Sequence, residues 1–308
     1  MNVLIVGGGG TIGSATAAYL AWKEIVDTVY ILDLNENMAE SHAMDLAQSA
    51  FSCSHTQVKA GDWSKLADCQ MMIVAAGLPA SVATHDYSRD LASLMPLIQQ
   101  IAQALRQYNP NAVVLSMTNP LDAFNYTLYQ VSGLPARQFL ALSQNDTLRF
   151  QWALAEHLGC RPEQVGCYVV GEHGPGKIPL FSTVTVDGQP KSFPPQEQQQ
   201  IQAEMAAWWK KFLEVSGNRT AGWTSGAAAA QVVEAVAGLR KAPIACSVIL
   251  EERQGYSMGW PVELDAAGVR AALTLHLTDE ETSQVNAAKA ALKAAQEEIR
   301  KYLGLDKN

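Results

Sequence analysis

The amino-acid sequence predicts an α/β protein in which a doubly wound parallel sheet is followed by a second, mixed α/β domain. Short, almost continuously apolar runs recur through the first half of the chain, and helical patterns lie between several of them. After residue 145 this rhythm changes. Strands that helices bury on both faces carry such uninterrupted apolar runs, and their alternation with helices is typical of parallel sheets.

Each predicted strand of the first domain is a run of apolar residues. The runs are VLIV at 3–6, VYIL at 29–32, MMIV at 71–74, AVVL at 112–115 and FLAL at 139–142. We place the domain boundary near 143–146, which gives a first domain of residues 1–144 and a second of residues 145–308.

The second domain is predicted to begin with a helix that opens near Asp146. The stretch STVTVDG at 182–188 then resembles a strand that runs into a turn. A long helix ends the chain. It begins with a capping box, because Thr278 is followed three residues later by Glu281, and it stops at Gly304.

The composition restricts the possible partners. The chain has 308 residues, a formal net charge of -8, 48% hydrophobic residues and 17% charged residues. This acidic balance argues against nucleic acid as the main partner, since phosphate binding needs a basic face. Five scattered cysteines without a C-x-x-C pair predict neither disulfides nor a metal site. The chain shows no basic leader and no long apolar span, so we expect no membrane segment and a cytoplasmic location.

A glycine-rich stretch, GGGGTIG, follows the first predicted strand and precedes a helical pattern. Backbone N–H groups approach a pyrophosphate only where no Cβ intervenes, and a helix N-terminus favours its negative charge. Gly8, Gly10 and Gly13 fit the dinucleotide pattern G-x-G-x-x-G. Gly7, Gly10 and Gly13 fit the wider pattern G-x-x-G-x-x-G equally well. We interpret the stretch as the phosphate-binding turn of a Rossmann domain.

An acidic residue lies at the position where a Rossmann domain binds the adenosine ribose. Asp33 ends the second predicted strand, 20 residues after Gly13, and can accept hydrogen bonds from an adenosine ribose. The alternative is a flexible turn with an unrelated surface acid, and the order of strand, loop, helix, strand and acid favours dinucleotide binding. No Lys or Arg lies between Asp33 and Ser41 to meet a 2′-phosphate, so NAD is favoured over NADP.

A histidine in the stretch GEHGPGKIP has possible partners elsewhere in the chain. Alone, His173 is either a proton carrier or a polar residue in a turn. Asp146 and Arg149, in NDTLRF, are three residues apart and share one helix face. An isolated pair of this kind is most simply a surface ion pair. Together with His173, however, the Asp can fix the imidazole tautomer and the Arg can hold a carboxylate with its planar fork.

Asn119 follows the predicted strand at 112–115, at the strand end where open α/β sheets bind ligands. Its alternative role is that of a turn residue before Pro120. A dinucleotide site, a His–Asp pair and a carboxylate clamp together predict hydride transfer to a 2-keto acid.

Nearly end to end, the sequence resembles the L-lactate/malate dehydrogenase family of NAD-dependent L-2-hydroxyacid dehydrogenases. The resemblance is carried by VGGGGTIG, ILDLN, AAGLP, TNPLDAF, NDTLRF, GEHG, GWTSGAAA and GWPVELDAAGV, in the family's order. It implies a Rossmann domain joined to a substrate-binding domain. It also implies homodimers or homotetramers that bind NAD and a small 2-hydroxy or 2-keto acid.

The resemblance further implies a role for each matching residue. His173 donates and accepts the proton, Asp146 orients it, and Arg149 clamps the substrate carboxylate. Asn119 contacts the nicotinamide side and the substrate, and Thr224 lies beside the pocket. The implied cofactor-binding residues are Gly7, Gly8, Gly10, Thr11, Ile12, Gly13, Asp33, Ala76, Gly77 and Asn119.

Two departures from the family pattern lie next to these residues. Pro175, Gly176 and Lys177 come shortly after GEHG, where the family usually carries an acid or another polar residue. Asn145 precedes Asp146, where the family is usually apolar.

The third departure is the active-site loop within residues 77–98. The resemblance implies a second catalytic arginine there, which polarises the substrate carbonyl. Arg89 is the only arginine in residues 1–105, yet it comes about three residues late after Pro79. An exposed arginine without a catalytic role is the alternative. Pro96 is expected to interrupt the helix that follows.

The same loop bears on the choice of substrate. Ala80 and Ser81 stand where malate-preferring relatives carry an arginine for the second carboxylate, and residues 77–88 contain no Lys or Arg. Burial of a carboxylate without a cation is costly. We therefore expect monocarboxylic 2-keto acids to be preferred, unless His85 or Lys177 supplies the charge. Malate dehydrogenase is the alternative, and a non-catalytic NAD-sensing protein is a more remote one.

Overall fold

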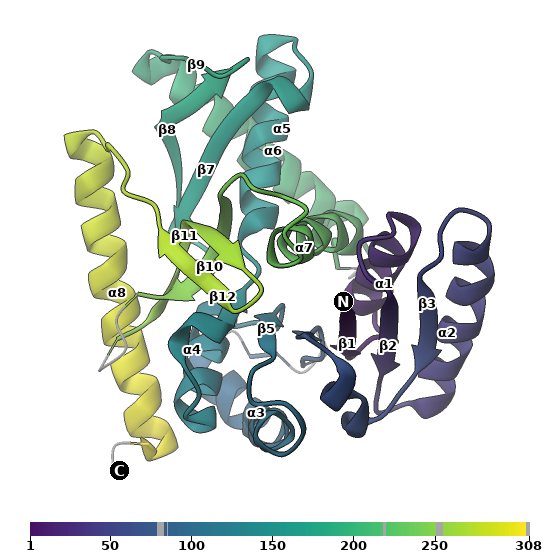
Figure 1. The fold of residues 1–308 in the computed structure, drawn as a ribbon. Coiled ribbons are helices and arrows are strands. Elements are labelled where there is room, and N and C mark those ends of the chain that lie inside the picture. The colour runs from purple at the N-terminus through teal and green to yellow at the C-terminus, as the bar shows by residue number, and fades with distance from the viewer. Residues whose placement is uncertain (79–82, 85, 218–219, 251–254, 306–308) are drawn as a thin grey trace.

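The computed structural model describes residues 1–78, 83–84, 86–217, 220–250 and 255–305. Within them, one twelve-stranded sheet has the order β3-β2-β1-β4-β5-β6-β10-β11-β7-β8-β9, with β12 paired to β11. Strands β1 to β6 are parallel (Figure 1). In order, they span Asn2–Val6, Thr28–Leu32, Gln57–Ala60, Met71–Val74, Val113–Ser116 and Phe139–Ala141.

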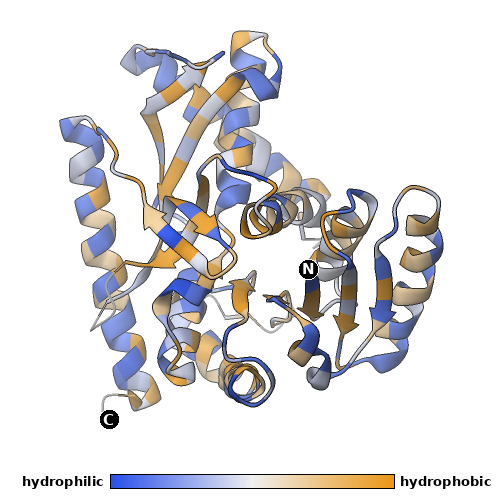
Figure 2. Ribbon diagram, in the orientation of Figure 1, coloured by the Kyte–Doolittle hydropathy of each residue, from blue (hydrophilic) through white to orange (hydrophobic). Residues whose placement is uncertain are grey.

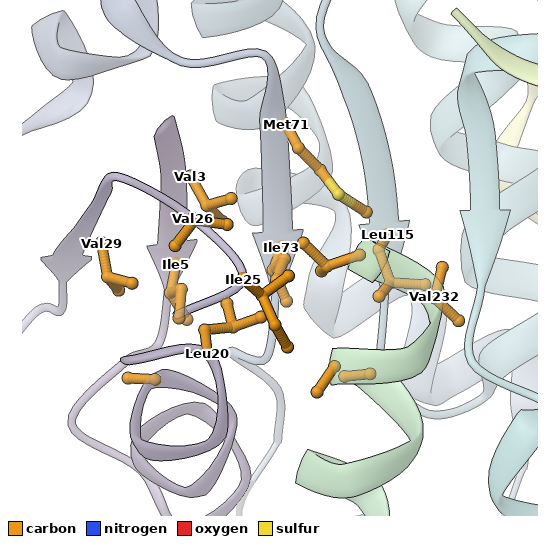
Figure 3. Close-up of a cluster of buried hydrophobic side chains, with 14 of the residues drawn as sticks. Val3, Ile5, Leu20, Ile25, Val26, Val29, Met71, Ile73, Leu115 and Val232 are labelled. Atoms are coloured by element: carbon orange, nitrogen blue, oxygen red, sulfur yellow. The ribbon is translucent and has the colours of Figure 1, made fainter. Parts of the chain in front are cut away.

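Helices cover both faces of the parallel half of the sheet. Successive side chains of a strand point to opposite faces, so a continuous apolar strand has apolar side chains to bury on each face. Val3 and Ile5 of β1 pack with residues of α1, α2 and α7, whereas Leu4 and Val6 pack with residues of α3 and α4. Figure 3 shows Leu20 of α1 on the same side of the strands as Val3 and Ile5. These five helices span Thr11–Trp22, Glu36–Phe51, Gly222–Val236, Tyr87–Tyr108 and Leu121–Ser132, in the order just named.

The second half of the chain extends the same sheet with antiparallel strands, beginning with β10 beside β6. In sheet order from β10, the strands β10, β11, β7, β8 and β9 span Ile244–Ile249, Ser257–Asp265, Val165–Gly171, Lys177–Val186 and Gln189–Pro190, and β12 spans Gly268–Ala272. The remaining helices α5, α6 and α8 span Gln144–Leu158, Pro195–Val215 and Asp279–Leu303. In the described part of the chain, three short 3-10 helices complete the elements: Trp63–Asp68, Ala136–Gln138 and Pro162–Gln164. In Figure 2 the strands near the centre are mainly orange, while the outer helix α8 carries many blue segments.

Two glycines let α7 approach α1 closely. A Cβ on Gly222 would lie 2.8 Å from a side-chain carbon of Thr11, and one on Gly226 would lie 3.0 Å from the Ala15 backbone. Small residues one helical turn apart thus bring a helix of the second half against the start of α1. Part of the GWTSGAAA motif therefore serves helix packing.

The structure confirms the predicted fold class and the five predicted strands of the first domain. The capping box of α8 is also present, because Thr278 Oγ1 accepts from the Glu281 N–H and the Glu281 carboxylate accepts from the Thr278 N–H. This helix ends at Gly304, which has a left-handed backbone. The stretch 182–188 is a strand that runs into a turn, as predicted: residues 182–186 are the second half of the longer β8, and 187–188 form the turn.

The expected interruption at Pro96 is wrong, because α3 runs through it without a break. Leu91, Leu94, Ile98 and Ile101 form a buried stripe along this helix. Pro96 itself lies on the exposed side, where water can hydrogen bond to the carbonyl that lacks a partner. Burial of the apolar stripe outweighs the loss of one hydrogen bond.

Candidate active site

The glycine-rich turn after β1 is built on close backbone contacts. Gly7 has a φ of +81°, and a Cβ on it would lie 2.4 Å from the Ala76 nitrogen. A Cβ on Gly13 would lie 2.3 Å from the Gly7 carbonyl oxygen, whereas one on Gly10 would meet nothing nearer than 3.4 Å. Of the two sequence patterns, the one that includes Gly7 contains the residue with the left-handed backbone.

The N-terminus of α1 is open to an anion. Its N-cap, Gly10, has no side chain to cap the helix, and the first turn carries no acid. The first N–H groups of a helix lack partners within it, so those of Thr11 and Ile12 are available to phosphate oxygens. The absence of Cβ atoms along the turn and the uncapped helix fit the pyrophosphate of NAD.

Asp33 lies directly after β2 and faces the same turn. Its Oδ2 accepts a hydrogen bond of 3.0 Å from the Gly9 N–H, and its Oδ1 accepts one of 3.0 Å from the Asn35 N–H. Each carboxylate oxygen can accept more than one bond, so Asp33 keeps acceptor capacity for ribose hydroxyls. The side chain therefore holds the turn and fits the predicted ribose contact.

The segment after β4 lies beside the glycine-rich turn, because a Cβ on Gly7 would meet the Ala76 backbone, and it is bonded to the segment after β5. Thr118 donates a hydrogen bond of 2.6 Å to the Ala76 carbonyl oxygen, and a Cβ on Gly77 would lie 3.3 Å from the Thr118 methyl group. Asn119 follows, exposed, at the carboxyl end of β5, and its peptide bond to Pro120 is cis. Ala76, Gly77 and Asn119 therefore lie at the strand ends where the sequence analysis placed them.

His173 lies in the tight turn between β7 and β8. The Glu172 N–H donates to the Gly176 carbonyl oxygen at 3.3 Å and closes the turn. Gly171 has a φ of +93°, and a Cβ on it would lie 2.4 Å from that same oxygen. The backbone of the turn thus leaves His173 little freedom of position.

Two carboxylates fix the histidine. Its Nδ1 lies 2.6 Å from Asp146 Oδ2, and its backbone N–H donates to Asp122 Oδ2 at 2.7 Å. Because an ionised carboxylate only accepts, Nδ1 is the donor, and Nε2 is the nitrogen available to a substrate. Burial lowers the pKa of His173, but the hydrogen bond to Asp146 and the charges of both carboxylates outweigh it and raise the pKa above its ordinary value.

Asp146 is buried among three cationic or titratable groups. Besides His173, Arg149 Nη1 lies 3.3 Å from its Oδ1, and Lys177 Nζ lies 3.4 Å from the same oxygen. Burial raises the pKa of Asp146, but His173, Lys177 and Arg149 outweigh it and hold the pKa below its ordinary value. The carboxylate therefore stays ionised wherever the histidine titrates.

The three departures from the family pattern have different outcomes. Lys177 contacts Asp146, so this departure puts a cation beside the candidate catalytic pair. The Asn145 side chain is buried, and its Oδ1 accepts from the Asp146 N–H at 3.1 Å. Arg89 is not brought to the site: its guanidinium is mostly exposed and pairs with Asp86 at 3.4 Å. Pro79, Ala80, Ser81 and His85 of the same loop lie outside the described residues.

A cavity of about 1580 Å³ opens beside Asp146, Arg149 and Thr224. Its walls are rich in aromatic residues that the sequence analysis did not single out. These are Tyr19, Trp152, Trp208, Trp209 and Trp223. The guanidinium of Arg149 lies over the Trp209 ring, 5.0 Å from its centroid, which is a cation–π contact. The paired tryptophans of AAWWKK were the available signal.

Asp122 is a further residue that the sequence analysis did not single out. It is buried at the start of α4 and binds the His173 backbone and the Ser247 hydroxyl. Burial raises its pKa, although both hydrogen bonds act in the other direction. Its signal was its place in TNPLDAF, three residues after Asn119.

Among the described residues, no three His, Cys, Asp or Glu side chains are grouped so that they could hold a metal ion. No helix in the described part of the chain is long and apolar enough to cross a membrane.

The glycine turn and the His173–Asp146 pair are those of an NAD-dependent dehydrogenase, and the chain belongs to the lactate/malate dehydrogenase family. The family's NAD-binding domain matches residues 1–141, and its α/β C-terminal domain matches residues 144–302. NAD is therefore the cofactor.

Individual relatives bear both of the family's names. A malate dehydrogenase of Bacteroides fragilis is 29% identical over 95% of this chain and 96% of its own length. An L-lactate dehydrogenase of Halalkalibacterium halodurans is 27% identical over 97% of each chain.

The similar solved structures also include both malate and lactate dehydrogenases. Malate dehydrogenase of Cryptosporidium parvum has a TM-score of 0.88 at 26% identity and covers 97% of this chain and 99% of its own. Lactate dehydrogenase of the same organism, complexed with lactic acid and NAD, has a TM-score of 0.86 at 26% identity over 97% of each chain. The similar proteins thus include both malate and lactate dehydrogenases.

Proposed function

We propose that this protein is an NAD-dependent L-2-hydroxyacid dehydrogenase that interconverts a 2-hydroxy acid and its 2-keto acid. The observation that carries the proposal is that the Asp146 carboxylate contacts both His173 and Arg149. Asp146 and Arg149 line the large cavity, and His173 lines an adjoining hollow of about 170 Å³ that shares Gly176, Ala288 and Ala291 with it. The three contacting side chains combine a proton carrier, the carboxylate that orients it and a cation for the substrate.

His173 is proposed to hold the transferred proton at Nε2. Asp146 fixes Nδ1 as the donor and stabilises the imidazolium. In keto-acid reduction, protonated His173 gives its proton to the forming hydroxyl oxygen, and in the reverse direction it takes that proton back. NAD supplies the complementary chemistry, which is exchange of a hydride with the substrate carbon.

Arg149 is proposed to bind the carboxylate next to the keto carbon. Its Nη1 lies 3.3 Å from Asp146 Oδ1, and its Nε is buried without a hydrogen-bond partner in the protein. Stacking on Trp209 holds the plane of the guanidinium, so little conformational freedom remains to be lost on binding. Thr224 lines the cavity, and Asn119 is exposed at the carboxyl end of β5; both are proposed to complete the substrate contacts.

Three further proposals concern Arg89, the domain boundary and assembly. The role of Arg89 in polarising the carbonyl requires that its guanidinium leave Asp86 and turn toward the substrate. The boundary near 143–146 and a homodimer or homotetramer also stay predictions.

The test is NADH oxidation with pyruvate, 2-ketobutyrate, 2-ketoisocaproate and oxaloacetate at one pH. Turnover of any of them supports the dehydrogenase. Malate dehydrogenase is the second candidate, because relatives with that name match the chain as fully as lactate dehydrogenases do. If NADH binds and no keto acid is reduced, the protein is an NAD sensor instead.

A further inference from the structure

Lys177 has a defined position in the candidate substrate cavity. It is the first residue of β8 and pairs with Gly171 across the hairpin whose turn holds His173. The backbone bond between Glu172 and Gly176 closes that turn immediately before Lys177. The lysine and the histidine are therefore held in a fixed relation by the same short hairpin.

The amino group of Lys177 and the guanidinium of Arg149 meet at a single carboxylate oxygen. Both lie on Asp146 Oδ1, at 3.4 Å and 3.3 Å. They can be no farther apart than the sum of these distances, about 6.7 Å. The two carboxylates of a three- or four-carbon dicarboxylic acid can bridge such a span.

The charge of this group suits a dianion. Asp146 contributes one negative charge, while Arg149 and Lys177 contribute one positive charge each. When His173 is protonated, as keto-acid reduction requires, the four side chains carry a net charge of +2. A monocarboxylic keto acid neutralises half of this charge, and a dicarboxylic one neutralises all of it.

The other charged residues nearby do not take over this role. Lys210 and Glu214, on the α6 wall of the cavity, are opposite in sign and offset each other. Glu172 and Asp122 line, together with His173, the adjoining hollow of about 170 Å³. There Glu172 accepts a hydrogen bond from the Tyr87 hydroxyl, and Asp122 accepts one from the His173 backbone N–H.

We infer that Lys177 is a specificity-determining residue that receives the second carboxylate of a dicarboxylic 2-keto acid, while Arg149 holds the carboxylate beside the keto carbon. The inference rests on the proposed dehydrogenase function. It reverses the monocarboxylate preference expected from the loop, because it places the missing cation on β8.

The test compares a matched pair of substrates in matched variants. For the wild type, Lys177→Met and Lys177→Arg, kcat/KM is measured with oxaloacetate and with pyruvate at one pH. Lys191→Met, which removes the same charge outside the cavity lining, is the control. Lys177→Met should lower kcat/KM for oxaloacetate at least about tenfold more than for pyruvate, and Lys177→Arg should restore most of the difference.

Equal losses for both substrates would show that Lys177 acts only through Asp146 and His173, and would overturn the inference, as would no loss at all. A binding measurement separates this failure from failure of the proposed function. The NADH-bound protein is titrated calorimetrically with tartronate, a dicarboxylate, and with oxamate, a monocarboxylate. Lys177→Met should weaken tartronate about tenfold and leave oxamate unchanged. If the wild-type protein reduces no keto acid, the proposed dehydrogenase function is wrong. If the wild-type protein also binds neither tartronate nor oxamate, the proposed role of Lys177 is wrong as well.

Discussion

The glycine turn after β1 and the hairpin turn between β7 and β8 are both tight and glycine-rich, yet they recognise ligands by different means. In the first, Gly7 and Gly13 remove side chains so that backbone groups and a helix N-terminus can face an anion. In the second, Gly171 serves to fix the turn, and side chains such as His173 are proposed to carry the chemistry. A substitution that adds a side chain should therefore impair binding at the first turn, and a substitution that removes a functional group should impair the activity of the second.

The largest expected effect is on the histidine. His173→Asn should lower turnover at least about a hundredfold, the scale of a lost general acid, while NADH affinity stays near that of the wild type. Single-turnover kinetics and an NADH fluorescence titration measure the two quantities separately. Near-normal turnover would refute the proton-carrier role, and a parallel loss of NADH affinity would show that the two turns are not independent.

Replacement of Arg149, the residue proposed to bind the substrate carboxylate, should have the next largest effect. Arg149→Lys keeps the charge but loses the planar fork and the stack on Trp209, so KM for the keto acid should rise about tenfold or more. The free energy of unfolding, from urea titration, serves as the control for structural damage. An unchanged KM would contradict the clamp.

The glycine turn should respond to a single methyl group. Gly13→Ala would bring a Cβ within 2.3 Å of the Gly7 carbonyl oxygen, so the turn must shift. With strain on the order of 1–3 kcal/mol, NADH affinity should fall about tenfold and Tm should drop. Gly10→Ala is the matched control, because its Cβ meets nothing nearer than 3.4 Å and Tm should hold. Wild-type NADH affinity in Gly13→Ala would mean that the close contact is not needed for binding.

The smallest effect is expected from pH, and it should separate the two turns. Because the pKa of His173 is raised, its protonated form persists above the ordinary titration range of histidine. The kcat/KM for keto-acid reduction should therefore stay level at low pH and fall as pH rises through that raised pKa, whereas NADH affinity, which depends on backbone groups, stays constant. A profile for reduction that rises over the same range would contradict the assignment of the proton donor.

Sequence patterns were sufficient where the structure depends on neighbours along the chain. A buried parallel strand is an apolar run, and a phosphate turn needs glycines at fixed spacing, so β1, its turn and α1 were predictable together. The capping box at Thr278 was predictable for the same reason. Pro96 was misjudged because the burial that keeps α3 intact comes from helices and strands distant in sequence.

The sequence by itself determined the family, the cofactor turn and the identities of His173, Asp146 and Arg149, because each is part of a short motif with its own chemistry. Only the tertiary structure decided how they meet. It showed that one sheet runs through both halves of the chain, that Asp122 binds the backbone of the histidine, and that Arg89 is exposed and pairs with Asp86. It also showed that Lys177 of β8 pairs with the Asp146 carboxylate of α5. Distances between residues far apart in sequence are set by the packing of whole elements, and no local pattern contains them.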